Sequence, residues 1–157
     1  MSAYVSFLTA FHTLISLIAL PFGVAAVRGL FGNEAAGRWT GWFLVLAVAT
    51  SVTGFFFPFA GVTPAFLVGI VALIVLAGVL YARYSTDMTG IWKMVYSGGM
   101  IISLYLLVFV TIAQAFDKIP VLNAIAPTPQ APAFAVVQLI ALAVFAFLGW
   151  KAIRQGP

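Results

Sequence analysis

Five long apolar runs limit what this chain can fold into more than any other feature of its sequence. They cover residues 4–28, 39–59, 64–84, 91–116 and 132–150. A helix rises ~1.5 Å per residue, so about 20 apolar residues cross a hydrocarbon core of ~30 Å. Strands would have to close into a barrel and alternate apolar with polar residues, and these uniform runs lack that alternation. The sequence therefore predicts an all-α fold, a single transmembrane bundle of five helices over residues 1–157.

The composition argues against a water-soluble globule. Hydrophobic residues make up 64% of the chain and charged residues 6%, whereas a soluble domain carries roughly 25% charged residues. We therefore expect the outer surface to face a lipid bilayer. The net charge of +4 does not indicate a nucleic-acid partner, because the bases stand singly at the ends of apolar runs and form no patch. The chain has no cysteine, which excludes disulfides, thiolate metal sites and cysteine nucleophiles.

The basic residues predict how the chain is threaded. With five spans, Lys118 falls on one side of the membrane, and the other six bases fall on the opposite side: Arg28, Arg38, Arg83, Lys93, Lys151 and Arg154. The same boundary also holds all four tryptophans, Trp39, Trp42, Trp92 and Trp150. Short loops rich in Lys and Arg stay in the cytoplasm, and tryptophans gather at membrane boundaries. We therefore expect the amino terminus outside and the carboxy terminus in the cytoplasm.

Several local features refine this arrangement. The first run has no basic residue before Arg28 and is too long for a signal peptide, so we expect a retained helix. Pro21 predicts a kink within that helix, and Pro58 is expected to end or bend the second one. The outer Pro-rich loop over residues 117–131 is either a short helix at the interface, a flap over the bundle, or an ordinary connector.

Polar side chains inside the apolar runs are the candidate ligand-binding residues. His12 is the only histidine, and at ~1.5 Å per residue it lies about 24 Å from Arg28, in the outer half of the membrane. Other polar residues of the first, second, fourth and fifth runs reach similar depths, which gives the candidate set His12, Ser16, Thr50, Thr53, Thr111, Gln114 and Gln138. The third run has no comparable group between Ala65 and Leu80, so we expect it to face lipid or a partner.

Two interpretations of this set remain open. In the structural one, Ser and Thr bond to carbonyls of their own helices while Gln and His hold neighbouring helices together. In the functional one, the residues line an outward-facing pocket beside Phe55, Phe56, Phe57 and Phe134. Such a pocket suits a haem or other porphyrin, a chlorophyll, a quinone or another amphiphile, with His12 as axial ligand or hydrogen-bond donor. A haem with two histidine ligands from one chain is excluded, and no His/Asp/Glu cluster indicates a metal site.

The sequence gives no sign of an enzyme. The three acids, Glu34, Asp87 and Asp117, lie in loops or at helix ends, and none is spaced for catalysis with another carboxylate or with His12. We therefore expect a non-enzymatic structural or accessory subunit, in a homo-oligomer or a larger membrane complex. The alternatives are the amphiphile-binding protein described above and a small-solute transporter or channel. The inner halves of the runs offer almost no polar lining for a channel.

Several stretches of the chain carry a resemblance to a known group of proteins. They are HTLISLIALPFG at residues 12–23, TSVTGFFFPF at 50–59, LYLLVFV at 104–110 and the tail of that run through residues 114–128. Together they resemble short bacterial inner-membrane proteins with four to five transmembrane helices and no assigned activity, although this chain has Leu107 where those proteins carry a polar residue. The resemblance implies a multi-pass protein of the bacterial inner membrane and supplies no mechanism.

Overall fold

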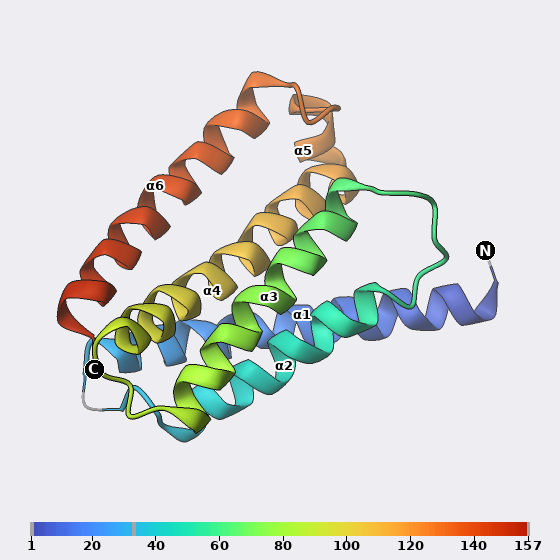
Figure 1. The fold of residues 1–157 in the computed structure, drawn as a ribbon. Helices are drawn as coiled ribbons and strands as arrows, with labels where there is room; N and C mark the ends of the chain where they lie inside the picture. The colour runs from blue at the N-terminus through green and yellow to red at the C-terminus, as the bar shows by residue number, and fades with distance from the viewer. Residues whose placement is uncertain (1, 33, 157) are drawn as a thin grey trace.

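The fold, described over residues 2–32 and 34–156 of a computed structural model, is built from α-helices joined by loops (Figure 1). The helices are α1 (Ala3–Leu30), α2 (Arg38–Gly54), α3 (Pro64–Ser85), α4 (Ile91–Lys118), α5 (Pro120–Ile125) and α6 (Pro132–Gln155). Four of them, α1, α3, α4 and α6, are long and apolar enough to cross a membrane. The prediction of an all-helical bundle is therefore confirmed for the described part of the chain.

The sequence predicts that the second helix extends to Phe59, but in the structure α2 ends at Gly54. The N–H of Phe55 closes the last turn on the carbonyl of Val52 at 3.1 Å. A helix that continued to Pro58 would bring the proline ring against the carbonyl of Gly54, four residues earlier. The first helix, by contrast, continues through Pro21 to Leu30.

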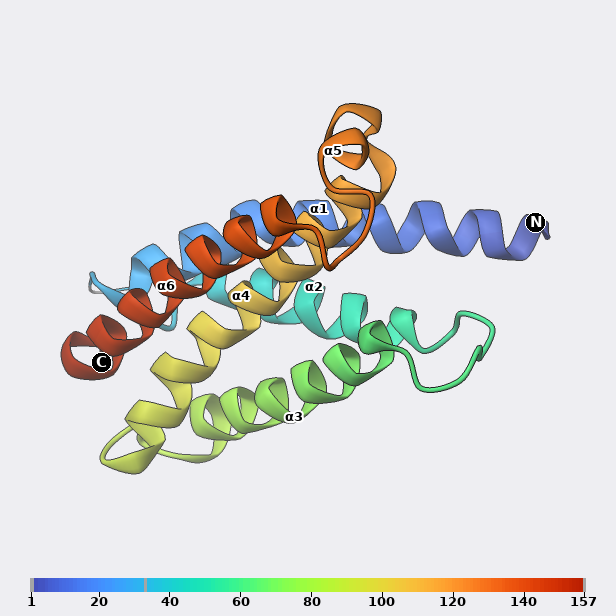
Figure 2. The same ribbon diagram turned by 90° about the horizontal axis from the view of Figure 1, so that it is seen from above.

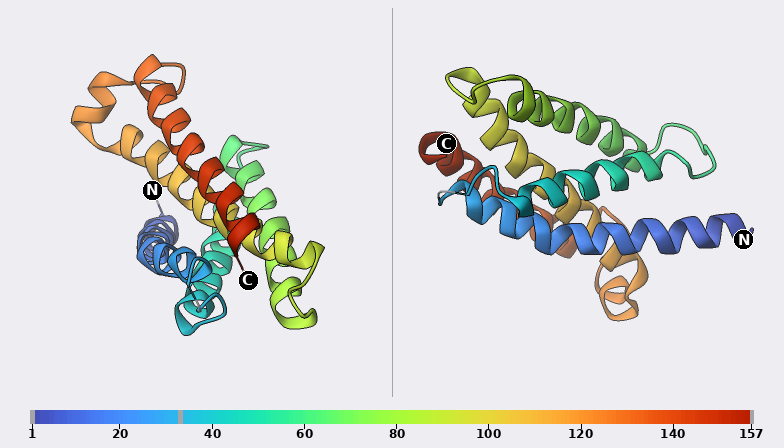
Figure 3. Two further views of the ribbon diagram at one scale, coloured as in Figure 1. Left: turned by 90° about the vertical axis from the view of Figure 1, so that its left-hand side faces the viewer. Right: turned by 90° about the horizontal axis from the view of Figure 1, so that it is seen from below.

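Helices α1 to α4 form a ring, and α5 and α6 lie outside it. Helices α1, α2, α3 and α4 pack against one another in chain order, α1 also contacts α4, and α6 packs on α4 (Figures 2 and 3). They converge where the α1–α2 and α3–α4 loops and the end of α6 lie, which we call the closed end (Figure 1). They spread apart at the open end, where α1 begins and where the α2–α3 loop and α5 lie.

Small residues permit the close packing of the closed end. A Cβ atom on Gly23 of α1 would lie 2.6 Å from Leu104 Cδ1 of α4 and 2.8 Å from Phe43 Cε2 of α2. Phe43 is fully buried there, as are Tyr96 and Met100 of α4. Without a hydrophobic force between helices in lipid, such close contact supplies the attraction that holds the bundle together.

A polar network also ties the closed end together. Arg83 of α3 donates to the carbonyl of Ala36 at 2.9 Å and to the hydroxyl of Tyr96 at 3.3 Å. The Tyr96 hydroxyl in turn donates to the carbonyl of Ala35, which also accepts from Thr40 at 3.2 Å. Side chains of α2, α3 and α4 thus satisfy two carbonyls of the α1–α2 loop.

The basic residues gather mainly at one end of the bundle, as the sequence predicts. Six of them lie at helix ends that meet at the closed end, and Lys151 of α6 places its Nζ 5.0 Å from the ring of Phe31, just after α1. Arg38 and Arg154 lie over the rings of Trp39 and Trp150. Lys118 ends α4 at the open end.

The Pro-rich segment at residues 117–131 contains the short helix α5, one of the expected alternatives. Asn123 of α5 donates to the carbonyl of Phe116 at 3.2 Å, which fixes α5 against the end of α4. Figures 2 and 3 show α5 turned away from the ring of helices. In this structure α5 therefore lies beside the end of α4 and does not cover the space between α1 and α4.

Candidate functional site

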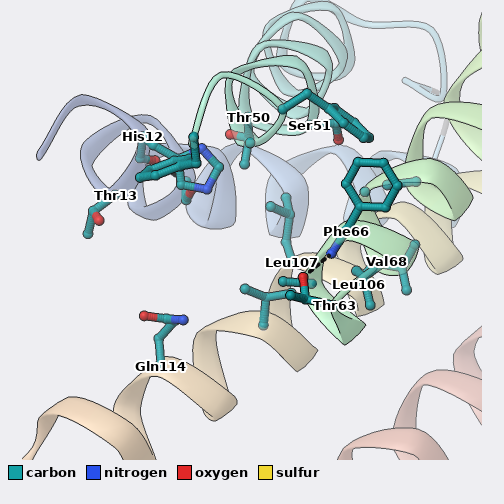
Figure 4. A pocket seen from close by; sticks show the side chains of 18 of the residues that line it. His12, Thr13, Thr50, Ser51, Thr63, Phe66, Val68, Leu106, Leu107 and Gln114 are labelled. Atoms are coloured by element: carbon teal, nitrogen blue, oxygen red, sulfur yellow. Dashed lines mark hydrogen bonds between the residues drawn. The ribbon is translucent and has the colours of Figure 1, made fainter. Parts of the chain in front are cut away.

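A cavity of about 550 Å³ lies between α1, α2, α3 and α4 and extends toward the open end (Figure 4). The spreading of the helices creates it, and the α2–α3 loop contributes to its wall. Small residues such as Ala47, Gly69 and Ala72 line it where larger side chains would fill the space. The polar residues around it are Thr9, His12, Thr13, Ser16, Thr50, Ser51, Thr63, Ser103, Thr111, Gln114 and Lys118.

His12 is held in one orientation by α2. Its Nδ1 lies 2.9 Å from Thr53 Oγ1, and that hydroxyl is also 2.8 Å and 3.1 Å from the carbonyls of Ala49 and Thr50. A threonine hydroxyl has a single hydrogen. When that hydrogen is directed to one of the carbonyls, Thr53 accepts from the Nδ1–H of His12, and in this tautomer Nε2 is the hydrogen-bond acceptor in the cavity wall.

Three of the hydroxyls that line the cavity are already satisfied within their own helices. Thr9 donates to the carbonyl of Val5 at 2.8 Å, and Ser16 donates to that of His12 at 2.6 Å. Thr111 of α4 donates to the carbonyl of Leu107 at 2.7 Å. This back-bonding is the structural role expected for Ser and Thr in apolar helices. These three hydroxyls therefore have no free hydrogen to offer a ligand.

Two cavity residues carry hydroxyls that are both buried and without a partner among the described residues. Thr50 and Ser103 are 7% and 4% exposed, and their Oγ atoms have no hydrogen-bond partner among the described residues. At ~1.5 Å per residue, Thr50 lies about 18 Å from Arg38 and Ser103 about 15 Å from Lys93, close to the middle of a ~30 Å core. Buried polar atoms are nearly always paired, so these two hydroxyls are exceptions, as are the equally unpartnered Ser97 Oγ and Gln138 Oε1 outside the cavity.

Aromatic rings form another part of the wall. Phe55 and Phe66 line the cavity with their ring centroids 5.1 Å apart, and Phe57 meets the edge of His12 at 5.5 Å. Two of the expected flanking rings lie elsewhere. Phe56 is exposed, and its carbonyl accepts from Tyr4 at 3.1 Å, while Phe134 packs on Phe116.

The structure brings five of the seven candidate residues to one cavity: His12, Ser16, Thr50, Thr111 and Gln114. Thr53 lies behind His12 and orients it without lining the space. Gln138 is outside, because it lies on α6, where it donates to the carbonyl of Phe109 at 3.1 Å. In Figure 4 the amide of Gln114 points away from α4, toward the side where His12 lies.

Sequence reasoning missed Ser103 and Lys118, which also line the cavity. A signal for both was present, since Ser103, Thr111, Gln114 and Lys118 follow one another at spacings that keep them on one face of a helix. The third helix, which the sequence assigns to lipid or a partner, contributes apolar wall such as Val68 and exposes residues such as Ile74 on its other side.

The charges of the cavity limit its chemistry. Among the residues that the structure describes, Lys118 at the open end is the only charged side chain in the wall, and no carboxylate lines it. The described residues contain no group of three or more His, Cys, Asp or Glu side chains able to hold a metal ion. What the wall offers is apolar surface, hydrogen bonds from hydroxyls and Gln114, and one imidazole acceptor.

Together the fold and the cavity define a class: a helical bundle with several helices able to cross a membrane and a largely apolar pocket between them. The chain matches no known protein family, no curated protein and no solved structure.

Proposed function

We propose that this chain is a multi-pass membrane protein that binds a lipid-soluble amphiphile in the cavity between α1 and α4. The observation that carries the proposal is a cavity of about 550 Å³ with a largely apolar wall that also contains His12 and Gln114. Small-molecule sites have volumes of ~300–1,000 Å³ and combine apolar walls with a few polar groups. A ligand from the bilayer would reach it between the spread ends of the helices.

The chain crosses the membrane five times in this proposal, with α2 as a fifth span. At ~1.5 Å per residue α2 is about 25 Å long, slightly short of a ~30 Å core. Two contacts support the crossing. Tyr4, near the start of α1, bonds to Phe56 just after α2, and Arg83 near the end of α3 bonds to Ala36 just before α2. The two ends of α2 thus lie at opposite ends of the bundle.

The closed end faces the cytoplasm, and the amino terminus is outside. The six bases at the closed end against Lys118 at the open end support this direction through the positive-inside rule. The resemblance to short bacterial inner-membrane proteins supports the inner membrane as the location. The cavity then belongs to the outer half of that membrane.

Ligand extraction tests the binding function. The protein would be purified in mild detergent, and lipid-soluble compounds extracted from it identified by mass spectrometry. Val110 lines the cavity and is half-buried, so Val110→Trp fills part of the space while Val110→Leu leaves most of it. We expect one compound enriched with the wild type and with Val110→Leu and depleted with Val110→Trp. Equal extracts from all three proteins would refute the proposal.

A second candidate function is that of an accessory subunit in a membrane assembly, which the exposure of α6 favours. In the most apolar stretch of α6, only 6% of the residues are buried, and the helix packs chiefly on α4. Its exposed face includes Leu139, Val144 and Phe147. Native mass spectrometry in detergent tests this function, and a monomer without any associated protein contradicts it. A channel is disfavoured because the buried core fills the closed end.

A further inference from the structure

The mouth of the cavity carries one charged group, and that charge is positive. Among the residues that the structure describes, Lys118 is the only charged side chain in the wall, and it lies where α4 ends at the open end. Asp117 precedes it in the sequence but does not line the cavity, because neighbouring residues of a helix point in different directions. A ligand at this end of the cavity therefore meets one ammonium group and no carboxylate in the described wall.

The position of Lys118 suits a polar head group at the membrane surface. At ~1.5 Å per residue it lies about 37 Å along α4 from Lys93, farther than the ~30 Å of a hydrocarbon core. Its side chain is exposed and can be reached by a ligand. An anionic group bound there avoids the high cost of a charge in the middle of the membrane.

A hydrogen-bond donor lies next to this charge on the same face of α4. Gln114 is four residues before Lys118, the spacing at which side chains of a helix are neighbours. Both line the cavity, and the amide of Gln114 points toward the side where His12 lies (Figure 4). That side chain is exposed and makes no hydrogen bond to the described residues. An ammonium group and an amide N–H one helical turn apart suit the two oxygens of a carboxylate.

Below these two groups the cavity is long and largely apolar. Its lining on α4 extends from Lys118 to Ser103, about 22 Å at ~1.5 Å per residue. The acyl chains of one leaflet fill half of a ~30 Å core, or about 15 Å, so an extended chain of ordinary length fits along the cavity. Ala47, Ala72 and Leu76 line its deep part and offer such a chain apolar contacts.

We propose that the ligand of the cavity is a long-chain fatty acid, an inference that rests on the amphiphile-binding function proposed above. Its carboxylate binds Lys118 and Gln114 at the outer surface, and its chain runs inward between the four helices of the ring. A cavity of about 550 Å³ is in the range of ~300–1,000 Å³ that holds drug-sized molecules. A single-chain acid is of that size, whereas a phospholipid with two chains is much larger.

Binding of an acid and of its methyl ester tests this inference. The full-length protein in nanodiscs of a zwitterionic phospholipid is titrated with hexadecanoic acid labelled with carbon-13 at the carboxyl group, or with the methyl ester labelled at the same carbon. Carbon NMR distinguishes bound ligand from ligand dissolved in the lipid, with empty nanodiscs as the blank. The two ligands share the chain, but only the acid is charged. We expect the acid to bind about fivefold more tightly than the ester, the effect of one Lys near a membrane surface.

Variants assign the head group and the chain to their places. Lys118→Gln should weaken binding of the acid about fivefold and leave that of the ester within about twofold. Gln114→Met keeps the size of the side chain and should weaken the acid more than the ester, since a hydrogen bond to a charged acceptor is the stronger one. Lys93→Gln is the matched control, because Lys93 lies at the other end of α4 and does not line the cavity. Val110→Trp fills part of the space and should displace both ligands.

The outcomes separate this inference from the function on which it rests. If the ester binds as tightly as the acid, or if Lys118→Gln weakens the acid no more than Lys93→Gln does, the inference is wrong. Displacement of both ligands by Val110→Trp then still supports the amphiphile-binding function. If phosphatidylglycerol at the same concentration displaces the acid, the occupant is a phospholipid and the inference is also wrong. If the wild type binds neither ligand above empty nanodiscs, the inference fails, and ligand extraction decides whether the binding function fails with it.

Discussion

Nδ1 of His12 in α1 lies 2.9 Å from Oγ1 of Thr53 in α2, and this hydrogen bond connects the two helices where the bundle begins to open. Thr53 Oγ1 is also within hydrogen-bonding distance of the carbonyls of Ala49 and Thr50 in its own helix. The only histidine of the chain is therefore positioned by a residue that does not itself line the cavity. We predict the tautomer in which Nδ1–H donates to Thr53 and Nε2 is the acceptor presented to the cavity.

Replacing the partner of His12 tests this arrangement. Thr53→Val keeps the shape of the side chain but leaves the Nδ1–H of a half-buried ring unpaired. We expect a loss of about 1 kcal/mol in the free energy of unfolding in detergent, the typical value of one hydrogen bond. Thr53→Ser retains the hydroxyl and should unfold as the wild type does. Nitrogen NMR of His12 should show the proton on Nδ1, and a proton on Nε2 in the neutral ring would contradict the bond direction.

The Tyr96 hydroxyl should contribute more to the stability of the fold than the hydrogen bond between His12 and Thr53 does. Tyr96→Phe removes the donor to the Ala35 carbonyl and the acceptor for Arg83 in a fully buried site. Two hydrogen bonds are lost, each typically worth about 0.5–1.5 kcal/mol, so we expect a loss of about 1–3 kcal/mol in unfolding titrations. Tyr105→Phe is the matched control on the same helix, because Tyr105 makes no side-chain hydrogen bond to the described residues. Equal stability of the two variants would show that the network contributes little.

Two glycine substitutions should have opposite effects. Gly23→Ala places a Cβ 2.6 Å from Leu104 and 2.8 Å from Phe43, so α1 must move away, and we expect a loss of about 1–3 kcal/mol. Gly41→Ala meets open space and should be neutral or slightly stabilising. Thermal unfolding of both variants in the same detergent measures the difference. A harmless Gly23→Ala would mean that the closed end is not tightly packed.

Reporter fusions test the direction of threading. A phosphatase that is active only outside the cytoplasm should be inactive at the carboxy terminus and active when inserted after Lys118. A fluorescent reporter that folds only in the cytoplasm should give the opposite pattern. We expect this pattern because Lys and Arg are in excess at the closed end, and short loops rich in these residues stay in the cytoplasm. Phosphatase activity at the carboxy terminus would reverse the orientation or change the number of crossings.

Depth along each helix could be predicted from the sequence, because it depends only on the constant rise per residue. Counting from the basic boundary put His12, Thr50 and Thr111 in the same half of the membrane, and the structure brings them to one cavity. The starts of α3 at Pro64 and of α6 at Pro132 could also be predicted from the sequence, since proline is favoured in the first turn of a helix. The end of α2 was predicted only in part: Pro58 indicates that the helix stops or bends there, but the apolar run continues to Phe59, whereas α2 ends at Gly54.

Which way each helix faces was decided only by the tertiary structure. Gln138 lies at a suitable depth but is turned to Phe109 outside the ring, whereas Ser103 and Lys118 are turned inward. A soluble helix reveals its buried face by a polar stripe on the opposite side. In a bilayer both lipid and helix neighbours accept apolar residues, so the pattern carries little information about rotation. The sequence determined how deep each polar group lies, and only the packing of the helices determined which of them meet.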